Sequence, residues 1–325
     1  MTSFVDGESR ISIGENEEGS RLDRVLQRYA GSAGRSLVLR LIRKGNVRVN
    51  GKRCKPEHRL SVGDRIYIPA SLRAGVESPA KAEYVPDKRL EQLQVLFEDD
   101  ALLVVNKPAG LVVHGGSGHR QGLIEGLRLE RGHVELQLAH RLDRDTSGCL
   151  LLAKNLAALR ELTAAFRGRE AHKTYFAWVA GCPYPSAGRL RSQLLKGKLH
   201  GGERMVAVGD GGAEAITDYQ VVLHAGRDGW DYSLLALQPE SGRTHQLRVQ
   251  LQNASHPILG DGKYGNREAN RLFREIGGRG LALHAWRLRF THPFTKHALD
   301  FRAPWPAWWS TCFANEKHRL LGSAF

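Results

Sequence analysis

Cysteine is scarce in this sequence, with only four among 325 residues. Cys54, Cys149, Cys182 and Cys312 lie far apart, and none belongs to a C-x-x-C pair of the kind that many zinc and redox sites use. A chain of this length does not need disulfides to fold. We therefore expect no metal site, and free thiols in a reducing compartment.

Long apolar runs are also missing. No stretch approaches the roughly 18 consecutive apolar residues that a membrane-spanning helix requires. Residues 1–8 carry neither the basic start nor the apolar run of a secretory signal. We expect a cytoplasmic protein without a membrane partner.

Motifs of nucleotide-driven and serine-hydrolase chemistry are absent too. Gly262-Lys263 is followed by Tyr264 and lacks the upstream glycine spacing of a phosphate-binding loop, and no dinucleotide fingerprint is present. No G-x-S-x-G sequence exists for a hydrolase nucleophile. The expected reaction therefore uses no small-molecule cofactor.

Acidic residues are too few to balance the basic ones. The chain has 34 Asp and Glu against 48 Lys and Arg, a net charge of +14 and a sequence pI of ≈ 9.9. Such an excess indicates a polyanionic partner, either nucleic acid or an acidic membrane surface. Residues 20–73 alone contain 14 Lys and Arg and 3 Asp and Glu, which is most of the excess. Charge alone fits a dedicated binding module and a solvated basic face equally well.

The pattern within 20–73 predicts a compact unit of two short helices and a hairpin. Apolar residues recur at helical spacing over 21–29 and 37–44, with a glycine-rich break at 31–34. Gly45 is suited to end the second helix. Strand-like alternation then leads into Asn50-Gly51, a strong tight-turn signal.

The order and spacing of several short sequences support an RNA-binding interpretation of this unit. They are Arg21-Leu22-Asp23, Gly45, Val47, Val49-Asn50-Gly51-Lys52 and Gly63-Asp64. Together they resemble the alpha-L RNA-binding domain first recognised in a small-subunit ribosomal protein. The resemblance implies RNA contacts by basic side chains, for which the candidates are Arg40, Arg43, Lys44, Arg48, Lys52 and Arg53. A small basic helical domain without RNA-binding function is the alternative.

The rest of the chain predicts a tail over 1–19, a linker over 74–92 and a larger domain over 93–325. The linker lacks periodicity and mixes Ala, Gly, Ser, Pro and Lys. Expected strands are 95–97, 102–106, 149–153, 174–179, 218–224 and 232–237, with a helix starting after Asn155 as N-cap. Because strands and helices do not alternate regularly, we expect an α+β fold with helices on a mixed, mainly antiparallel sheet.

Polar residues are densest in an apolar context at 140–147, directly before the predicted strand 149–153. A polar loop that abuts a buried strand can present catalytic groups on a rigid scaffold. His140, Asp143 and Ser147 would also supply a hydrolase triad, but adjacency in sequence is not triad geometry. A loop held together by salt bridges is the structural alternative.

Four segments occur in a fixed order around this loop. They are Asn106-Lys107-Pro108-Ala109-Gly110-Leu111, His140-Arg141-Leu142-Asp143 with Thr146-Ser147-Gly148, Lys173-Thr174-Tyr175-Phe176-Ala177-Trp178-Val179-Ala180-Gly181, and Gly242-Arg243-Thr244-His245-Gln246-Leu247-Arg248 with His256-Pro257-Ile258-Leu259-Gly260-Asp261. With Leu283-His284-Ala285 and Phe290-Thr291-His292-Pro293 they resemble the RNA pseudouridine synthase family over about 93–305. The resemblance implies isomerisation of uridine.

The resemblance also implies roles for three residues. Asp143 would be the nucleophile, and Arg243 would pair with it, because a guanidinium favours a carboxylate that burial disfavours. Tyr175 would stack on the uracil and help to remove the proton from carbon 5. The carboxylate can add to the ribose, add to the base or remove a ribose proton, and the sequence leaves these routes open.

Because the target uracil is stacked within RNA, the nucleotide must be flipped out. Arg141 is a candidate to fill the vacated space, with a salt bridge to Asp145 as the alternative. Further residues expected to contact RNA are His140, Thr146, Arg248, His245 and Lys107.

In this family an N-terminal alpha-L domain is common among enzymes that act on large-subunit ribosomal RNA. We therefore expect 23S ribosomal RNA, free or in an assembling subunit, as the partner of a monomeric enzyme. The alternatives are a sister enzyme for other ribosomal uridines or transfer RNA, a non-catalytic RNA-binding factor, and a hydrolase with a carboxylate pair.

Overall fold

Contacts between residues divide the chain into two units, Met1–Pro86 and Asp87–Phe325. The computed structural model describes residues 10–14, 17–29, 35–69, 72, 87–91, 93–115, 122–133, 135–200, 203–227 and 229–314. The expected linker, 74–92, lies mostly outside these residues. Its last part is not a linker, because α4 (Lys88–Glu91) buries Leu90 in the core of the second unit.

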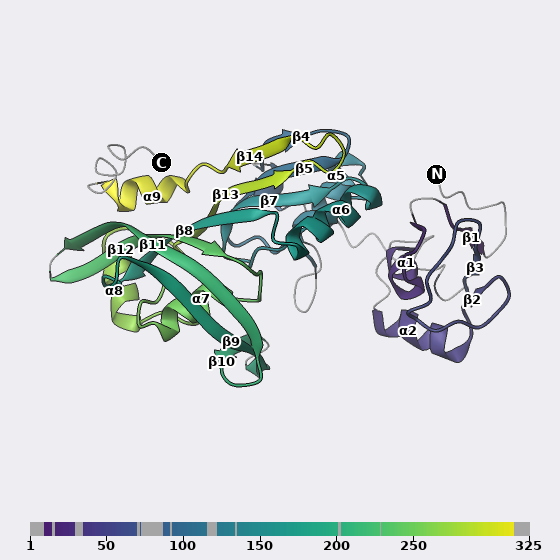
Figure 1. Cartoon of the computed structure of the whole chain (residues 1–325), viewed down its shortest axis with the longest axis horizontal. Coiled ribbons are helices and arrows are strands. Elements are labelled where there is room, and N and C mark those ends of the chain that lie inside the picture. The colour runs from purple at the N-terminus through teal and green to yellow at the C-terminus, as the bar shows by residue number, and fades with distance from the viewer. Residues whose placement is uncertain are drawn as a thin grey trace. The chain divides into compact units, whose positions relative to one another are not determined.

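The described residues of the first unit include the helices α1 and α2 and a three-stranded antiparallel sheet (Figure 1). The elements are β1 (Arg10–Ser12), α1 (Leu22–Tyr29), α2 (Arg35–Lys44), β2 (Arg48–Val49) and β3 (Arg65–Tyr67), and the strand order is β1-β3-β2. Residues at helical spacing, including Leu22, Val25, Val38 and Leu41, form its core. The predicted helices are thereby confirmed. The expected tight turn at Asn50-Gly51 is closed by a single bridge between Val49 and Lys52, and β2 pairs with β3 further along the chain. The break at 31–34 lies outside the described residues.

The second unit is built on one large sheet. Its strands are β4 (Gln94–Glu98), β5 (Leu102–Lys107), β6 (Gln137–Leu138), β7 (Ser147–Ala153), β8 (His172–Ala180), β9 (Ala187–His200), β10 (Glu203–Val208), β11 (Ala213–Arg227), β12 (Trp230–Pro239), β13 (Leu283–Thr291) and β14 (Ala298–Arg302). The order is β10-β9-β11-β12-β8-β13-β7-β5-β4, with β14 beside β13 and β6 beside β7. Within the described chain only β13 and β7 pair in parallel, so the mixed, mainly antiparallel α+β prediction is confirmed.

Helices pack beside both halves of this sheet (Figure 1). They are α5 (Leu123–Arg131), α6 (Leu156–Arg167), α7 (Gln246–Asn253), α8 (Arg267–Glu275) and α9 (Ala307–Cys312). The α6 helix begins as predicted, because the Asn155 side chain accepts a hydrogen bond from the Ala158 amide at 2.8 Å. The sequence did not indicate the long hairpin of β9 and β10 or the pair β13 and β14. Within the described part of the chain, no helix is long and apolar enough to cross a membrane.

The parallel contact between β7 and β13 fixes the loop that precedes β7. Ser147 lies opposite His284, and Gly148 lies opposite Ala285. Gly148 has φ 111°, and a Cβ there would lie 2.2 Å from the carbonyl oxygen of Ala285. Only glycine allows the two backbones to approach this closely. The strand that follows residues 140–146 is therefore locked to the centre of the sheet.

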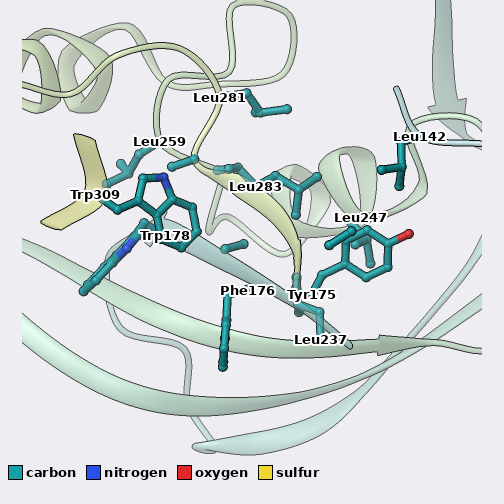
Figure 2. Close-up of a cluster of buried hydrophobic side chains, with 14 of the residues drawn as sticks. Leu142, Tyr175, Phe176, Trp178, Leu237, Leu247, Leu259, Leu281, Leu283 and Trp309 are labelled. Atoms are coloured by element: carbon teal, nitrogen blue, oxygen red, sulfur yellow. The ribbon is translucent and has the colours of Figure 1, made fainter. Parts of the chain in front are cut away.

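The hydrophobic core of the second unit reaches the end of that loop. Trp178 and Trp309 occupy one part of the buried cluster in Figure 2, and Tyr175 lies in another part beside Leu142 and Leu247. The hydroxyl group of Tyr175 points away from the two tryptophans. Tyr175 therefore marks where the core gives way to a polar site.

Candidate active site

A cavity of about 110 Å³ opens beside the Asp143 loop. Its walls come from that loop, from Tyr175 on β8, from the segment 239–245 and from the first turn of α7. Three of the four predicted motif segments, together with Leu283, therefore meet at one place. The polar lining residues are Arg141, Asp143, Thr146, Tyr175, Ser241, Arg243, Thr244, His245, Gln246 and Arg248.

The backbone around Asp143 is tied to a buried lysine. The carbonyl oxygen of Arg144 accepts hydrogen bonds from Lys107 Nζ and from the Gly110 amide, both at 2.9 Å. Lys107 also donates to the carbonyls of Pro108 and Leu111, and burial lowers its pKa to about 7. The prediction that Lys107 contacts RNA is wrong, because its ammonium is buried and holds the loop.

His140 also supports the fold of the loop. Its Nε2 accepts a hydrogen bond from the Leu151 amide at 3.1 Å, and its ring packs on Phe166. Burial, with an added contribution from the charge of Lys173, lowers the pKa of His140 to about 3. The imidazole is therefore neutral and fixes the start of the loop to β7, which does not favour the predicted RNA contact.

Arg141 and Thr146 both line the cavity, as expected of residues near a bound nucleotide. Thr146 is buried, and its amide donates to the carbonyl of Asp143 at 3.2 Å. Arg141 is exposed, and the salt bridge considered for it is formed instead by Arg144 with Asp145. Contact of Arg141 and Thr146 with RNA stays a prediction.

The cation that faces Asp143 is Arg248. Its Nη1 lies 3.8 Å from Oδ2 of Asp143, whose side chain is 25% exposed. Its Nε and Nη2 donate to the two carboxylate oxygens of Asp261, each at 2.7 Å. Asp261 thus orients the buried guanidinium by a bidentate pair and leaves the third nitrogen directed at Asp143.

The predicted pairing of Asp143 with Arg243 is therefore wrong. Arg243 precedes α7 and is exposed, whereas Arg248 lies in its first two turns and is buried. The side-chain oxygen of Gln246 accepts hydrogen bonds from the Arg243 amide at 3.1 Å and from the Ser241 hydroxyl at 2.8 Å. This clamp fixes the backbone of the segment, and the Arg243 side chain lies at the cavity wall.

Tyr175 presents a buried hydroxyl to the same cavity. Burial and the nearby charge of Asp143 raise the pKa of this tyrosine above its ordinary value. The phenol is therefore neutral at physiological pH and offers a ring face and a polar tip. A neutral tyrosine can stack on a flat base, but it cannot act as a phenolate base.

His245 is held in an unusual backbone conformation before α7. Its φ is 54°, in the left-handed region that costs a non-glycine residue about 1–3 kcal/mol. Its Nδ1 lies 2.9 Å from the Tyr264 hydroxyl, which also accepts a hydrogen bond from the Val206 amide at 2.9 Å. His245 and Arg248 were expected on one helical face. Although His245 is the N-cap, both residues line the cavity.

The basic side chains of the first unit surround a separate groove of about 900 Å³. Of the residues predicted from sequence, Lys44, Arg48 and Arg53 line it, whereas Arg40, Arg43 and Lys52 are exposed elsewhere on the unit. The sequence did not indicate the other lining side chains, which are Arg10, Asn46, Asn50, Arg65 and Tyr67. Among the described residues that line the groove, none is acidic.

Comparisons with known proteins identify a family for each of the two units. A family model described as RNA pseudouridylate synthase matches residues 101–253, and a model of the S4 domain matches residues 20–66. Ribosomal large subunit pseudouridine synthase C of Escherichia coli K12 is 41% identical over 298 residues, covering 90% of this chain and 92% of that protein. The protein of the same name from Haemophilus influenzae is 40% identical over 297 residues, covering 90% of each chain. This chain belongs to the RNA pseudouridine synthase family.

Solved structures show the same pseudouridine synthase fold. Human RNA pseudouridylate synthase domain containing 4 is 28% identical with a TM-score of 0.55, covering 72% of this chain and 95% of that one. Human RNA pseudouridylate synthase domain containing 1 is 26% identical with a TM-score of 0.56, covering 72% of this chain and 96% of that one. The first unit of this pseudouridine synthase is an S4 domain, which confirms the resemblance drawn for residues 20–73.

Two residues of the pseudouridine synthase site had no role assigned from sequence. Asp261 is the last residue of the segment 256–261, which was recognised only as a motif, and Tyr264 follows it. Asp261 is buried, and Tyr264 places its ring 5.1 Å from the Arg248 guanidinium. The sequence signal was an aspartate in an apolar context near a motif arginine, since a buried carboxylate needs a partner. Among the described residues, no group of His, Cys, Asp or Glu could hold a metal ion.

Proposed function

We propose that this enzyme isomerises uridine to pseudouridine in large-subunit ribosomal RNA, with Asp143 as the nucleophile. The observation that carries the proposal is the position of the Asp143 carboxylate in a cavity, 3.8 Å from Arg248 and beside the buried Tyr175. Arg248 keeps a positive charge because Asp261 pairs with it and raises its pKa against the opposing effect of burial. Arg248 therefore presents a fixed positive charge to the carboxylate of Asp143.

The reaction rearranges bonds within one nucleotide. The bond from N1 of uracil to C1′ of ribose breaks, and a bond from C5 to C1′ forms. The proton on C5 leaves, and N1 gains a proton. An ionised Asp143 is required whether it adds to the ribose, adds to the base or removes a ribose proton. The neutral ring of Tyr175 would support the uracil while it turns.

The cavity can receive the base only from a flipped-out nucleotide. Arg141 is exposed at the cavity wall, so it can occupy the space that the uridine leaves in the RNA. Thr146 and His245 also line the cavity, which supports contact of both residues with the nucleotide. Each of these roles follows from position alone.

The proposed substrate is 23S ribosomal RNA. The bacterial relatives at 40% and 41% identity are named for the large ribosomal subunit, and the S4 domain adds a groove whose described lining is basic. Phosphate contacts by such a groove would hold a large RNA without reading its sequence. An enzyme with this substrate would work in the cytoplasm as a monomer.

Asp143→Asn is the direct test, with Asp145→Asn as its control. Asp145 lies two residues away and is paired with the exposed Arg144. With 23S fragments carrying tritium at C5 of uridine, the wild type and Asp145→Asn should release tritium, and Asp143→Asn should release none. RNA affinity of Asp143→Asn should stay within about threefold of the wild type. Tritium release by Asp143→Asn would sink the proposed nucleophile.

Pseudouridine mapping on transcripts tests the substrate. We expect the wild type to modify 23S fragments and to leave transfer RNA transcripts unmodified. Modification of transfer RNA alone would replace the proposed substrate with that of a sister enzyme. Release of free uracil would instead indicate a hydrolase.

A further inference from the structure

A second cavity of about 400 Å³ adjoins the active-site cavity. The two share the segment Ser241–Arg243 as a common wall. The other walls of the second cavity come from the end of α6 and from single residues on β11 and after β12. Its volume lies within the roughly 300–1,000 Å³ typical of ligand pockets.

The carboxylates at this second cavity are already paired. Glu240 accepts from Arg169 at 2.5 Å and lies 3.2 Å from Arg189. Glu214 lies 3.8 Å from Arg191. The acidic lining is therefore neutralised by neighbouring arginines.

Two exposed lining arginines remain without a carboxylate. Within the described residues, the guanidinium groups of Arg167 and Arg243 have no hydrogen-bond acceptor or ion pair. Arg167 is the last residue of α6, and Arg243 stands on the wall shared with the active site. The cavity therefore has a positive surface beside the proposed nucleophile.

Lys173 adds a third cation behind this wall. Its Nζ lies 5.8 Å from the centre of the Phe166 ring and 3.6 Å from where a Cβ of Gly242 would stand. Phe166 and Gly242 both line the second cavity. In the described part of the chain, the ammonium has no acceptor, and burial lowers its pKa. Holding an unpaired ammonium there destabilises the fold, unless an anion binds beside it.

We propose that Arg167, Lys173 and Arg243 bind a phosphodiester of the RNA strand next to the flipped uridine. This inference rests on the proposed function. Two planar guanidinium groups and an ammonium match the oxygens of a phosphate. The shared wall places that phosphate one step along the strand from a base in the active-site cavity. The contact positions the nucleotide without reading its sequence.

The first test compares Arg167→Gln and Arg243→Gln with Arg160→Gln. Arg160 lies on α6 two turns before Arg167 and is exposed outside the cavity. Single-turnover conversion of a 23S fragment gives the concentration for half-maximal rate and the rate at saturation. Each cavity variant should raise that concentration about tenfold, as expected for loss of one hydrogen bond to a charged group. The rate at saturation should change less than threefold.

Salt dependence separates a phosphate contact from a loss of structure. Each cavity variant should reduce the slope of log affinity against log salt by about 0.7, the value for one phosphate on a single strand. Arg160→Gln should keep the wild-type slope. Cavity variants whose slopes and half-maximal concentrations match those of Arg160→Gln would overturn the proposal.

Lys173→Met gives a readout that a structural role would not produce. Removing an unpaired buried charge should raise the melting temperature, while affinity for RNA falls. A lower melting temperature with unchanged affinity would show that Lys173 only supports the fold, and would remove it from the subsite.

A methylphosphonate scan then locates the phosphate. One linkage at a time is made neutral, at 2′-deoxy positions, on either side of the target uridine in the 23S fragment. One linkage should weaken binding to the wild type and have no further effect on Arg243→Gln. Equal effects of every linkage on both proteins would contradict the subsite.

Binding of a single-stranded oligouridylate separates this inference from the proposed function. If the wild type converts no uridine in 23S fragments, the proposed substrate fails. The cavity variants should still show weaker, less salt-dependent oligouridylate binding than Arg160→Gln. If conversion occurs and the variants bind as Arg160→Gln does, only the phosphate subsite fails.

Discussion

Arg248 lies between two carboxylates of different character, with Nη1 3.8 Å from Asp143 and the other two nitrogens bound to Asp261. The Asp261 side chain is fully buried, whereas that of Asp143 is partly open to the cavity. The buried pair fixes the guanidinium in advance, so its charge at Asp143 requires no rearrangement when RNA binds. Arrangements of this kind stabilise charge that forms during a reaction.

Replacing Arg248 should therefore affect stability and catalysis by separable amounts. Arg248→Met leaves Asp261 buried without a counter-charge, with only the amides of Lys263 and Tyr264 donating to it, and should lower the free energy of unfolding by about 3–5 kcal/mol. Arg248→Lys keeps a charge for Asp261 and should destabilise less. Because one ammonium cannot serve both carboxylates in this geometry, its single-turnover rate should still fall about 100-fold. Urea unfolding and conversion of 23S fragments measure the two effects.

The matching substitution at Asp261 provides the control. Asp261→Asn should reduce the rate while Asp143 is unchanged, because Arg248 is no longer held in place. A variant with wild-type conversion and a stable fold would contradict the positioning role of Asp261.

The buried His140 should make the free energy of unfolding depend on pH. Its pKa is about 3 in the fold and about 6.5 in an unfolded chain. Below pH 6.5 the unfolded state takes up a proton that the folded state does not accept until about pH 3. Stability therefore falls as pH decreases through this window, by up to about 1.4 kcal/mol per pH unit from this residue.

His140→Gln should remove that contribution to the slope. Free energies of unfolding between pH 4 and pH 6.5 measure it, and the difference at pH 8 reports the change in packing alone because His140 is then neutral in both states. An unchanged slope in His140→Gln would mean that the ring is protonated in the fold. Protonation at Nε2 would also break its hydrogen bond with Leu151.

Adding a single methyl group at Gly148 should strongly reduce the free energy of unfolding. In Gly148→Ala the Cβ would overlap the Ala285 carbonyl, and the backbone is already at φ 111°. We expect a loss of more than about 3 kcal/mol and a lower conversion rate, since β7 follows the Asp143 loop. Gly132→Ala is the control, with φ 68° and open space around its Cβ, and should cost about 1 kcal/mol. If urea unfolding shows equal losses of stability in Gly148→Ala and Gly132→Ala, the close contact between Gly148 and Ala285 is contradicted.

The sequence predicted most of the fold but only part of the site. Alternating and helical patterns located the S4 helices, six strands and the start of α6, because burial imposes those periods. The β9 and β10 hairpin was missed because much of β9 is polar, with Arg189 and Arg191 exposed along it. The parallel contact of β7 with β13 joins residues 137 positions apart, and no local pattern reports such a pairing.

Two errors at the site have a common physical origin. The motif contains both Arg243 and Arg248, and either spacing could bring a guanidinium to Asp143. Only the start of α7 after His245 decides which arginine is buried. Lys107 was expected to contact RNA, whereas its ammonium donates to three backbone carbonyls here, although lysines are rarely buried. Residue type does not reveal which polar groups a fold will satisfy internally.

The exposed sheet of the S4 domain predicts how that unit binds RNA. Tyr67 on β3 lies opposite Arg10 on β1 and Arg48 on β2, and is 43% exposed. An aromatic ring between two arginines suits stacking on an unpaired base with phosphates on either side. Tyr67→Ala should weaken binding of single-stranded RNA by about 1–3 kcal/mol.

Base stacking by Tyr67 and phosphate contacts by arginines should respond differently to salt concentration. Tyr67→Ala removes no charge, so its salt slope should equal that of the wild type, whereas Arg48→Gln should reduce the slope by about 0.7. Val62→Ala controls for loss of an exposed apolar side chain, and Arg24→Gln for loss of a charge on α1. Anisotropy titrations at several salt concentrations measure all four. If Tyr67→Ala binds as tightly as Val62→Ala, the ring does not stack on RNA, and the groove acts through charge alone.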